Sequence, residues 1–432
     1  MSNVTPIHPL PSQILQVVRL WHTAFRQFED LLAAGRCSLS SVVVDAAHAV
    51  AQADLVDVVR TSGGNVILDT KAVELAFQGS VSTKTSRLPW GHVDGKPHVP
   101  QDWIGENGRR RCEAIAEFAV EKGVGTVLAP SHAISGANDP WFEVDQRALE
   151  MLRRALDLAG GAQIQIDVPL VLPNSLFQRT DEIQLLRVRL ETAEFGNLWI
   201  RSSGFGMKAT GGGLEKFVRG ADLLGEAGHP ILADCVAGMP GLAAAALGSI
   251  CGVAHGAAEK DQFRVENLKR PRPSDSKFGP PRRIYVRSID QHLTERVARE
   301  LLEVRGLRSL LQCNDAGCCP KGFEDTVRNN RGHAVNQMAA QLRELSAQPE
   351  RQRPHHFQAQ MLNPVSLALA RISTTKALPE GLKKSLETAA NSSQRRSDAF
   401  QKLLKERGET MRLARVPTFG VSCVRKNAEV QR

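Results

Sequence analysis

The stretch HPILADCVAGMPGLAAAALGSICGVAHG, residues 229–256, decides the fold of this chain. It contains an apolar run, a turn with glycines, an alanine-rich segment of helical length and a second apolar run that ends in glycine. Two short apolar runs joined by one helix are typical of a βαβ unit with parallel strands. The stretch therefore predicts an α/β protein in which this unit is repeated.

Short apolar runs of the same kind occur along most of the chain. Eight of them are strand candidates, at residues 41–45, 65–69, 125–130, 164–169, 198–202, 230–234, 249–256 and 283–288. Eight is the number of strands that a closed barrel requires, and several of these runs end in a charged or polar residue. We therefore predict a (βα)8, TIM-like barrel whose functional groups follow its strands.

The segments around these strands suggest a domain organisation. Residues 12–34 carry apolar side chains at helical spacing and precede Gly35, which predicts a docking helix. We expect an N-terminal helical segment, the barrel, a Cys/His segment and a basic helical tail, at residues 1–39, 40–305, 306–345 and 346–432. The chain starts without a signal-peptide pattern and has no apolar run of about 18 residues. We therefore expect a cytoplasmic protein with no membrane contact.

Polar residues at strand ends are the catalytic candidates. Asp69 and Asp234 end two predicted strands, and His132 and His255 lie at the ends of two others. Two carboxylates in different environments can divide the roles of acid or base and nucleophile. Arg201, at a further strand end, is a ligand-binding candidate. The alternative is that such residues only cap the helices that follow.

Two loops are candidate ligand-binding elements. Gly238 and Gly241 begin the helix of the 229–256 unit, where unpaired backbone N–H groups attract a phosphate or carboxylate. Tight packing of that helix on its strand requires the same small residues. The long loop at residues 87–105 contains Trp90 and His92, and it is either a lid over the barrel mouth or a packed surface loop anchored by its tryptophans.

The positive charge of the chain is concentrated near its end. Residues 346–432 hold 16 Lys or Arg and 7 Asp or Glu, which accounts for the whole net charge of +9. This tail and a basic arm at residues 262–283 would be the contacts for DNA or RNA, if either binds. The expected contacts are Lys269, Arg270, Arg272, Arg282, Arg283, Arg395 and Arg396. The alternatives are a solvated arm and a tail that serves solubility or assembly with an oligomeric or complex partner.

Three cysteines and a histidine gather after the predicted barrel. Cys313, Cys318, Cys319 and His333 are the ligand set of a structural Cys3His zinc site. Zinc bound there would join the end of the barrel to the helix that starts near His333. The alternative is a buried thiol pair with a solvent-facing histidine, because two neighbouring residues rarely ligate the same ion.

A barrel followed by such a cluster, on a basic chain, resembles the tRNA-guanine transglycosylase superfamily, including its relatives that place deazaguanine bases in DNA. Asp234-Cys235-Val236 is similar to the nucleophile strand of that superfamily, and Ile67-Leu68-Asp69 to the strand that bears its general base. The resemblance implies base exchange at a glycosidic bond and a structural zinc. Three features depart from the pattern: the Cys-x4-Cys-Cys spacing, the missing arginine-bearing string after the nucleophile, and the place of Asp234 on the sixth predicted strand.

Three functions therefore compete. The first is an enzyme that acts on a nucleoside or nucleic-acid base, with transglycosylase-like chemistry at Asp69 and Asp234. The second is a small-molecule barrel enzyme of the lyase or aldolase type that binds a phosphorylated metabolite at the Gly238 turn. No lysine ends a predicted strand, so a Schiff-base mechanism is not expected. The third is a non-catalytic scaffold in a nucleic-acid-associated complex.

Overall fold

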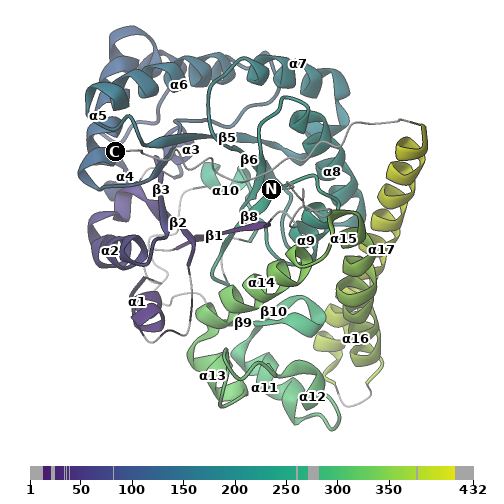
Figure 1. Cartoon of the computed structure of the whole chain (residues 1–432). Helices are drawn as coiled ribbons and strands as arrows, with labels where there is room; N and C mark the ends of the chain where they lie inside the picture. Colours follow the sequence, from purple (N-terminus) through teal and green to yellow (C-terminus); the bar gives the residue numbers. More distant parts are fainter. Residues whose placement is uncertain are drawn as a thin grey trace, which may run out of the picture.

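Eight parallel strands close into a single barrel in the computed structural model, so the predicted (βα)8 fold is confirmed (Figure 1). The structure describes residues 13–20, 25–33, 35, 37, 39–80, 82–258, 261–270, 282–375 and 378–413. Each strand pairs with the next one in the sequence, and the last pairs with the first. The strands are β1 (Leu15–Arg19), β2 (Ser41–Asp45), β3 (Asn65–Asp69), β4 (Thr126–Leu128), β5 (Gln165–Pro173), β6 (Leu198–Ser203), β7 (Ile231–Asp234) and β8 (Gly252–Gly256).

Helices connect consecutive strands and surround the barrel in Figure 1. Most connections contain one main helix, whereas the connection from β3 to β4 contains three. The helices are α1 (Phe25–Ala33), α2 (Ala53–Thr61), α3 (Ala72–Leu75), α4 (Thr83–Ser86), α5 (Gly105–Glu121), α6 (Pro140–Leu158), α7 (Thr180–Glu191), α8 (Gly211–Gly225) and α9 (Gly238–Ala246). Among the described residues, no helix is both long enough and apolar enough to cross a membrane.

The first strand lies where the sequence predicts a helix. Residues 15–19 form β1, which pairs with β8 from Leu15↔Gly252 to Arg19↔Gly256 and also pairs with β2. The helical prediction is wrong for this part of 12–34, and a helix begins only at Phe25. Val17 and Val18 are β-branched and fit a strand that is buried on both faces. The barrel therefore begins before residue 40.

The last predicted strand lies outside the barrel. Residues 283–286 form β9 (Arg283–Val286), which pairs only with the antiparallel β10 (Gln291–Thr294). The eighth barrel strand is β8, so the barrel ends at Gly256, and Asp234 ends the seventh strand instead of the sixth. The number of strands was predicted correctly, but the first and last members were not.

The described chain after the barrel forms α10 (Glu266–Lys269), α11 (Glu295–Glu303), α12 (Arg308–Leu311), α13 (Phe323–Arg328), α14 (Asn330–Ser346), α15 (Arg353–His356), α16 (Asn363–Ser373) and α17 (Glu380–Leu413). The helices from α11 onward pack against one side of the barrel, whereas α10 lies near Ser80 and Ser203. Helix α17 runs beside α8 and α16 in Figure 1. Phe357 and Phe400 are fully buried and share one apolar core with Leu242 of α9. The described part of the predicted tail therefore belongs to the same folded body.

The interior of the barrel is filled by one apolar layer. Val17, Val43, Ile67, Leu128, Trp199, Leu232 and Ala254 form this layer, and all are buried. Because side chains alternate along a strand, the residue two positions later also faces the barrel axis, one layer nearer the carboxyl end. The fold thus predicts which side chains reach the mouth of the barrel.

Candidate active site at the carboxyl end of the barrel

The layer above the apolar interior is charged. Arg19, Asp45, Asp69, Arg201 and Asp234 each lie two residues after a member of the apolar layer, and each is at or near the carboxyl end of its strand. Four of them form what we call the mouth cluster: Arg19, Asp69, Arg201 and Asp234, whose exposed fractions are at most 6%. Three of the strand-end residues that the sequence singled out, Asp69, Arg201 and Asp234, therefore meet at one place.

The mouth cluster is a closed ionic network. The Arg19 guanidinium donates from Nε and Nη2 to the two oxygens of Asp234, at 2.5 and 2.8 Å, and from Nη1 to Asp69 at 2.7 Å. Arg201 donates from Nε to Asp234 at 2.7 Å and from Nη2 to Asp69 at 3.2 Å. Each carboxylate thus contacts both arginines.

Both aspartates of the cluster are ionised at neutral pH. Burial alone would raise the pKa of Asp69, but the charges of Arg201, Lys71 and Arg19 outweigh it and hold that pKa well below 3.8. Burial likewise opposes ionisation of Asp234, and Arg19 and Arg201 lower its pKa below 3.8. These environments do not separate the two carboxyls into an acid and a base. They favour charged roles, as a nucleophile, as a proton acceptor or as a partner for positive charge.

A lysine that the sequence argument passed over lies beside the cluster. Lys71 follows β3 by two residues, is buried, and has a left-handed backbone with φ 62°. Its ammonium pairs with Glu74 and, at 3.4 Å, with Asp45. Burial would lower the pKa of Lys71, but Asp45 and Glu74 raise it above its ordinary value, so the amine stays protonated. Schiff-base chemistry at Lys71 is therefore disfavoured.

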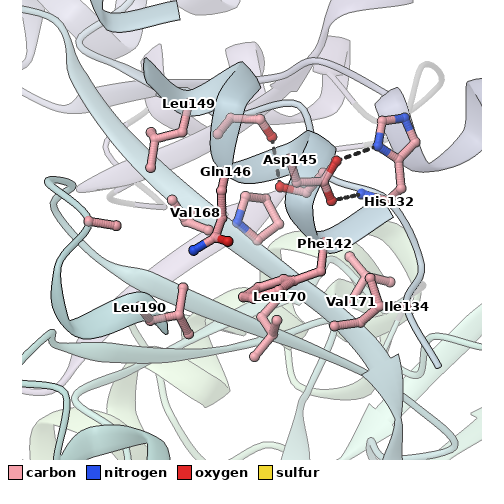
Figure 2. Close-up of a pocket in the computed structure, with 14 residues that line it drawn as sticks. His132, Ile134, Phe142, Asp145, Gln146, Leu149, Val168, Leu170, Val171 and Leu190 are labelled. Carbon is pink, nitrogen blue, oxygen red and sulfur yellow. Dashed lines mark hydrogen bonds and ion pairs between the residues drawn. The ribbon is translucent and has the colours of Figure 1, made fainter. Parts of the chain in front are cut away.

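His132 belongs to a separate buried dyad. Its Nδ1 lies 2.6 Å from Oδ1 of Asp145, and its backbone N–H donates to Oδ2 at 2.7 Å (Figure 2). The imidazole stacks on Trp141 of α6 with ring centres 3.7 Å apart, and its buried Nε2 has no hydrogen-bond partner. Burial raises the pKa of Asp145, although His132 partly offsets this. None of the hydrogen bonds described for His132 reaches the mouth cluster.

His255 connects three elements of the scaffold. It lies on β8, where its Nδ1 contacts the Gly256 carbonyl oxygen at 2.7 Å and its Nε2 contacts Nε2 of Gln16 at 2.9 Å. The Gln16 amide also donates to the Val335 carbonyl of α14. Burial lowers the pKa of His255, so the ring is neutral at neutral pH. These contacts indicate a structural role for His255, and its predicted catalytic role gains no support from them.

The long loop after β3 is packed against the protein. Trp90 and Trp103 are fully buried, and the Trp90 indole donates to the Thr70 carbonyl at 2.9 Å. His92 contacts Asp102 within the loop at 3.0 Å. The tryptophans therefore anchor a surface loop, as the second interpretation of this sequence proposed, and these contacts leave Trp90 no free edge for a ligand.

The predicted anion site at the Gly238 turn is filled by the chain itself. Asp290, from the segment after the barrel, accepts a hydrogen bond from the Met239 backbone N–H at 3.1 Å. A Cβ atom at Gly238 would lie 2.4 Å from Oδ1 of Asp290, and Gly238 and Gly241 are both buried. The group that meets this turn is a carboxylate of the same chain. The assignment of Gly238 and Gly241 to an external ligand is wrong, because an internal carboxylate occupies the position.

The cysteines and the histidine do come together. The ligand atoms of Cys313, Cys318, Cys319 and His333 all lie within 4.8 Å of one another. Both Cys318 Sγ and Cys319 Sγ lie 3.4 Å from Nδ1 of His333 and 3.7 Å from each other. A tetrahedral zinc ion with Zn–S of about 2.3 Å and Zn–N of about 2.0–2.1 Å has S···S and S···N edges of about 3.8 and 3.6 Å.

Surrounding groups hold this cluster in position. His333 is buried, and its Nε2 lies 2.9 Å from the Tyr285 carbonyl, which leaves Nδ1 for a metal. The Thr326 hydroxyl donates to Cys319 Sγ at 3.3 Å, and the Gln337 amide contacts Cys313 Sγ at 3.4 Å. The alternative of a buried thiol pair with a solvent-facing histidine is therefore wrong for His333, which is buried, and a Cys3His cluster able to hold a metal is present.

The predicted nucleic-acid contacts divide into exposed and buried residues. Arg396 is 3% exposed and lies 3.3 Å from Asp290, so it is not available to a polyanion, and its assignment is wrong. Other tail cations pair with acidic residues of α8, as Lys402 does with Glu215 at 2.6 Å. The exposed members of the predicted set are Lys269, Arg270, Arg282, Arg283 and Arg395, and Arg272 lies outside the described residues.

Arg19 is the site residue that the sequence argument missed. It was assigned to a helix, although Leu15-Gln16-Val17-Val18-Arg19 shows the pattern of the other strands, an apolar run that ends in a charged residue. The same error displaced the barrel start and so concealed the second cation of the cluster. The signal that identifies Arg19 is the charged residue two positions after the inward-facing Val17.

Comparisons with known proteins give no family for this chain. No protein-family model matches the sequence, and no curated protein matches it. Among solved structures, a putative phosphonomutase from Burkholderia cenocepacia J2315 is 15% identical, with a TM-score of 0.32, over 57% of this chain and 88% of that one. The carboxyl transferase domain of Rhizobium etli pyruvate carboxylase is 10% identical, with a TM-score of 0.37, over 89% of this chain and 60% of that one. At such TM-scores these likenesses carry no argument about function.

Proposed function

We propose that this chain is an enzyme whose reaction takes place at the carboxyl end of the barrel, on the mouth cluster. The observation that carries this proposal is the convergence of Arg19, Asp69, Arg201 and Asp234, all nearly fully buried, at the strand ends. Barrel enzymes place their active sites at this face. Buried ion pairs are often no more stable than apolar residues of the same volume, so stability alone is a weak reason for such a cluster.

For the reaction itself, we propose base exchange at a glycosidic bond of a nucleoside or nucleic acid. Two ionised carboxylates at one site suit a reaction in which positive charge develops on a sugar carbon. In this scheme the Asp234 carboxylate attacks the anomeric carbon and breaks its bond to the departing base, which takes a proton from water. The incoming base then attacks the same carbon, breaks the bond to Asp234 and gives its proton to the Asp69 carboxylate. The position of Asp234 on the seventh strand and the gathered Cys3His ligands support this proposal, whereas the Cys-x4-Cys-Cys spacing and the missing arginine-bearing string still depart from the transglycosylase pattern.

The test is incorporation of a labelled deazaguanine base into DNA and into tRNA by the wild-type chain. Asp234→Asn and Asp69→Asn should each abolish incorporation, whereas Asp181→Asn, an exposed control on α7, should not. Thermal melting of every variant separates loss of chemistry from loss of fold. Incorporation by Asp234→Asn at the wild-type rate would remove Asp234 from the mechanism.

A second candidate is a reaction on a small phosphorylated or carboxylated metabolite, in which the arginines bind the substrate. Arg19 and Arg201 present two guanidiniums at the barrel mouth, and guanidinium matches phosphate and carboxylate geometry. An incoming anion would displace Asp69 or Asp234 from its arginine partners. Calorimetric titration with inorganic phosphate and with malonate tests this candidate, since binding should disappear in Arg201→Gln. Binding that persists in Arg201→Gln would exclude this site.

For the Cys3His cluster we propose a structural zinc. The S···S and S···N distances fit a tetrahedral ion, and three thiolates with one imidazole are a closed ligand set that leaves no position for substrate. The cluster also joins the segment before α13 to the start of α14, next to β9. Bound zinc would therefore stabilise the part of the chain that follows the barrel.

For nucleic-acid recruitment, we propose the exposed cations of the 262–283 arm, together with Arg395. Lys269, Arg270, Arg282, Arg283 and Arg395 are all exposed. The test is fluorescence anisotropy with labelled DNA and RNA across a salt series. Replacement of these five residues by glutamine should weaken binding and flatten the salt dependence. Affinity equal to the wild-type value in the fivefold variant would rule out this surface.

A further inference from the structure

A fully buried carboxylate outside the barrel holds the turn that follows Asp234. Asp290 precedes β10, is completely buried and has a left-handed backbone with φ 48°. Its oxygens accept hydrogen bonds from the Met239 backbone N–H at 3.1 Å, the Tyr285 hydroxyl at 3.1 Å and the Arg396 guanidinium at 3.3 Å. One side chain therefore connects a barrel turn, the β9/β10 sheet and the C-terminal helix.

The turn that Asp290 holds begins directly after β7. Asp234 ends the strand, Cys235 has a positive φ of 59°, and α9 starts at Gly238 with φ 66°. A side chain at Gly238 would collide with the Asp290 carboxylate, so the turn and the carboxylate fit each other closely. A positive φ at a non-glycine residue such as Cys235 persists only when the surroundings fix it. Asp290, from outside the barrel, therefore contacts the turn that directly follows Asp234.

Arg396 supplies the charge that keeps Asp290 in this role. It lies on α17, is 3% exposed, and donates to the Met207 carbonyl at 3.4 Å as well as to Asp290. Burial raises the pKa of Asp290, and the Arg396 charge opposes that effect. Without Arg396, a carboxylate in this dry position would take up a proton or draw in water. Either event would weaken its hold on the Met239 N–H.

We propose that Arg396 is a positioning residue: through Asp290 it fixes the turn at residues 235–239 and thereby the place of Asp234 in the active site. This inference rests on the proposed function, because the exact position of Asp234 matters for activity only if Asp234 takes part in the reaction. It assigns the C-terminal helix a part in the active site without any contact with substrate. The matched surface cation is Lys384, which lies on the same helix and is exposed.

The experiment measures the opening of the turn and needs no substrate. Cys235 is buried within the turn, so its alkylation by iodoacetamide, followed by mass spectrometry, reports how often the turn opens. Arg396→Gln should speed this alkylation on the order of tenfold, which corresponds to about 1.4 kcal/mol. Arg396→Lys should restore much of the protection, and Lys384→Gln should leave it unchanged. Cys112, buried in α5, serves as the internal standard for global unfolding.

Two results would overturn the proposal. One is alkylation of Cys235 in Arg396→Gln at the rate found in Lys384→Gln. The other is equal acceleration at Cys235 and Cys112, which would show that Arg396 acts on the stability of the whole chain. If Arg396→Gln does not fold, Asp290→Asn is measured in its place, with the same expected result at Cys235. Failure of the base-exchange assay would leave this measurement intact, so the two proposals fail separately.

Discussion

Asp234 has no exposed surface and contacts both arginines of the mouth cluster, so its charge is part of the folding energy as well as of any chemistry. Removing one partner from a buried ionic network leaves the others uncompensated. We expect Asp234→Asn to lower the free energy of unfolding by on the order of 3 kcal/mol at pH 7. Urea denaturation measures this loss, with Asp181→Asn as the exposed control. If the unfolding free energy falls by less than the error of the measurement, water must hydrate Arg19 and Arg201 in the variant, in which residue 234 carries no charge.

Asp69 should make stability depend on pH in the acid range. Its pKa in the folded chain lies well below 3.8, its ordinary value, because of Arg201, Lys71 and Arg19. The ionised form therefore favours the folded state, and the contribution is complete above pH 3.8 and disappears as the pH falls below it. In urea titrations the difference in unfolding free energy between wild type and Asp69→Asn should stay constant from pH 6 to about pH 5 and shrink as the pH falls through 3.8 toward the lower pKa of the folded chain. A constant difference would contradict the low pKa.

At the scale of the element, the start of α9 is a turn made for glycine. Gly238 has φ 66° and faces the Asp290 carboxylate, which would lie 2.4 Å from an added Cβ. Gly238→Ala should lower the free energy of unfolding by about 1–3 kcal/mol, because alanine is strained at a positive φ and its Cβ would contact the carboxylate closely. Gly212→Ala in the first turn of α8 is the control, since nothing lies within 4 Å of its Cβ. Equal melting temperatures for the two variants would show that the Asp290 side chain can move away from a Cβ at residue 238 with no loss of stability.

The Cys3His cluster makes an element-scale prediction that is independent of catalysis. Purified protein should contain one zinc ion per chain by elemental analysis, and a chelator should lower the melting temperature. Cys319→Ser should remove the metal, because Cys319 Sγ contacts both His333 and Cys318. Cys112→Ala, a buried thiol in α5, should keep it. Full zinc content in Cys319→Ser would exclude this ligand set.

At the scale of the whole molecule, the C-terminal helices belong to the barrel's own core. Phe400 and Leu403 of α17 are buried in the apolar cluster that contains residues of α8 and α9. A chain that ends at residue 378 should therefore lose solubility or show a much lower melting temperature than the full chain. Lys384→Gln, which removes only an exposed charge of α17, should melt as the wild type does. A truncated chain with wild-type melting would show that α17 is an independent appendage.

The sequence was sufficient for the class of fold and for three of the four residues of the mouth cluster. Strand bodies of apolar residues with charged ends identify Asp69, Arg201 and Asp234, because the alternation of side chains along a strand places each of them in the layer above the apolar interior. The four residues of the Cys3His cluster were also visible from their types. These features depend on local pattern, which a sequence contains in full.

Only the tertiary structure could decide which groups neutralise one another. Asp290 fills the turn of α9, Arg396 pairs with Asp290, and Arg19 joins the mouth cluster across the closure of β1 on β8. Along the chain, Asp290 is 51 residues from Met239, Arg396 is 106 residues from Asp290, and Arg19 is 215 residues from Asp234. The sequence alone supplied their charges and determined a polar layer at the barrel mouth. Burial decides which cation pairs with which carboxylate and which cation stays exposed. A charge that is removed from water is stable only beside an opposite charge, and the tertiary structure determines which opposite charge lies near it.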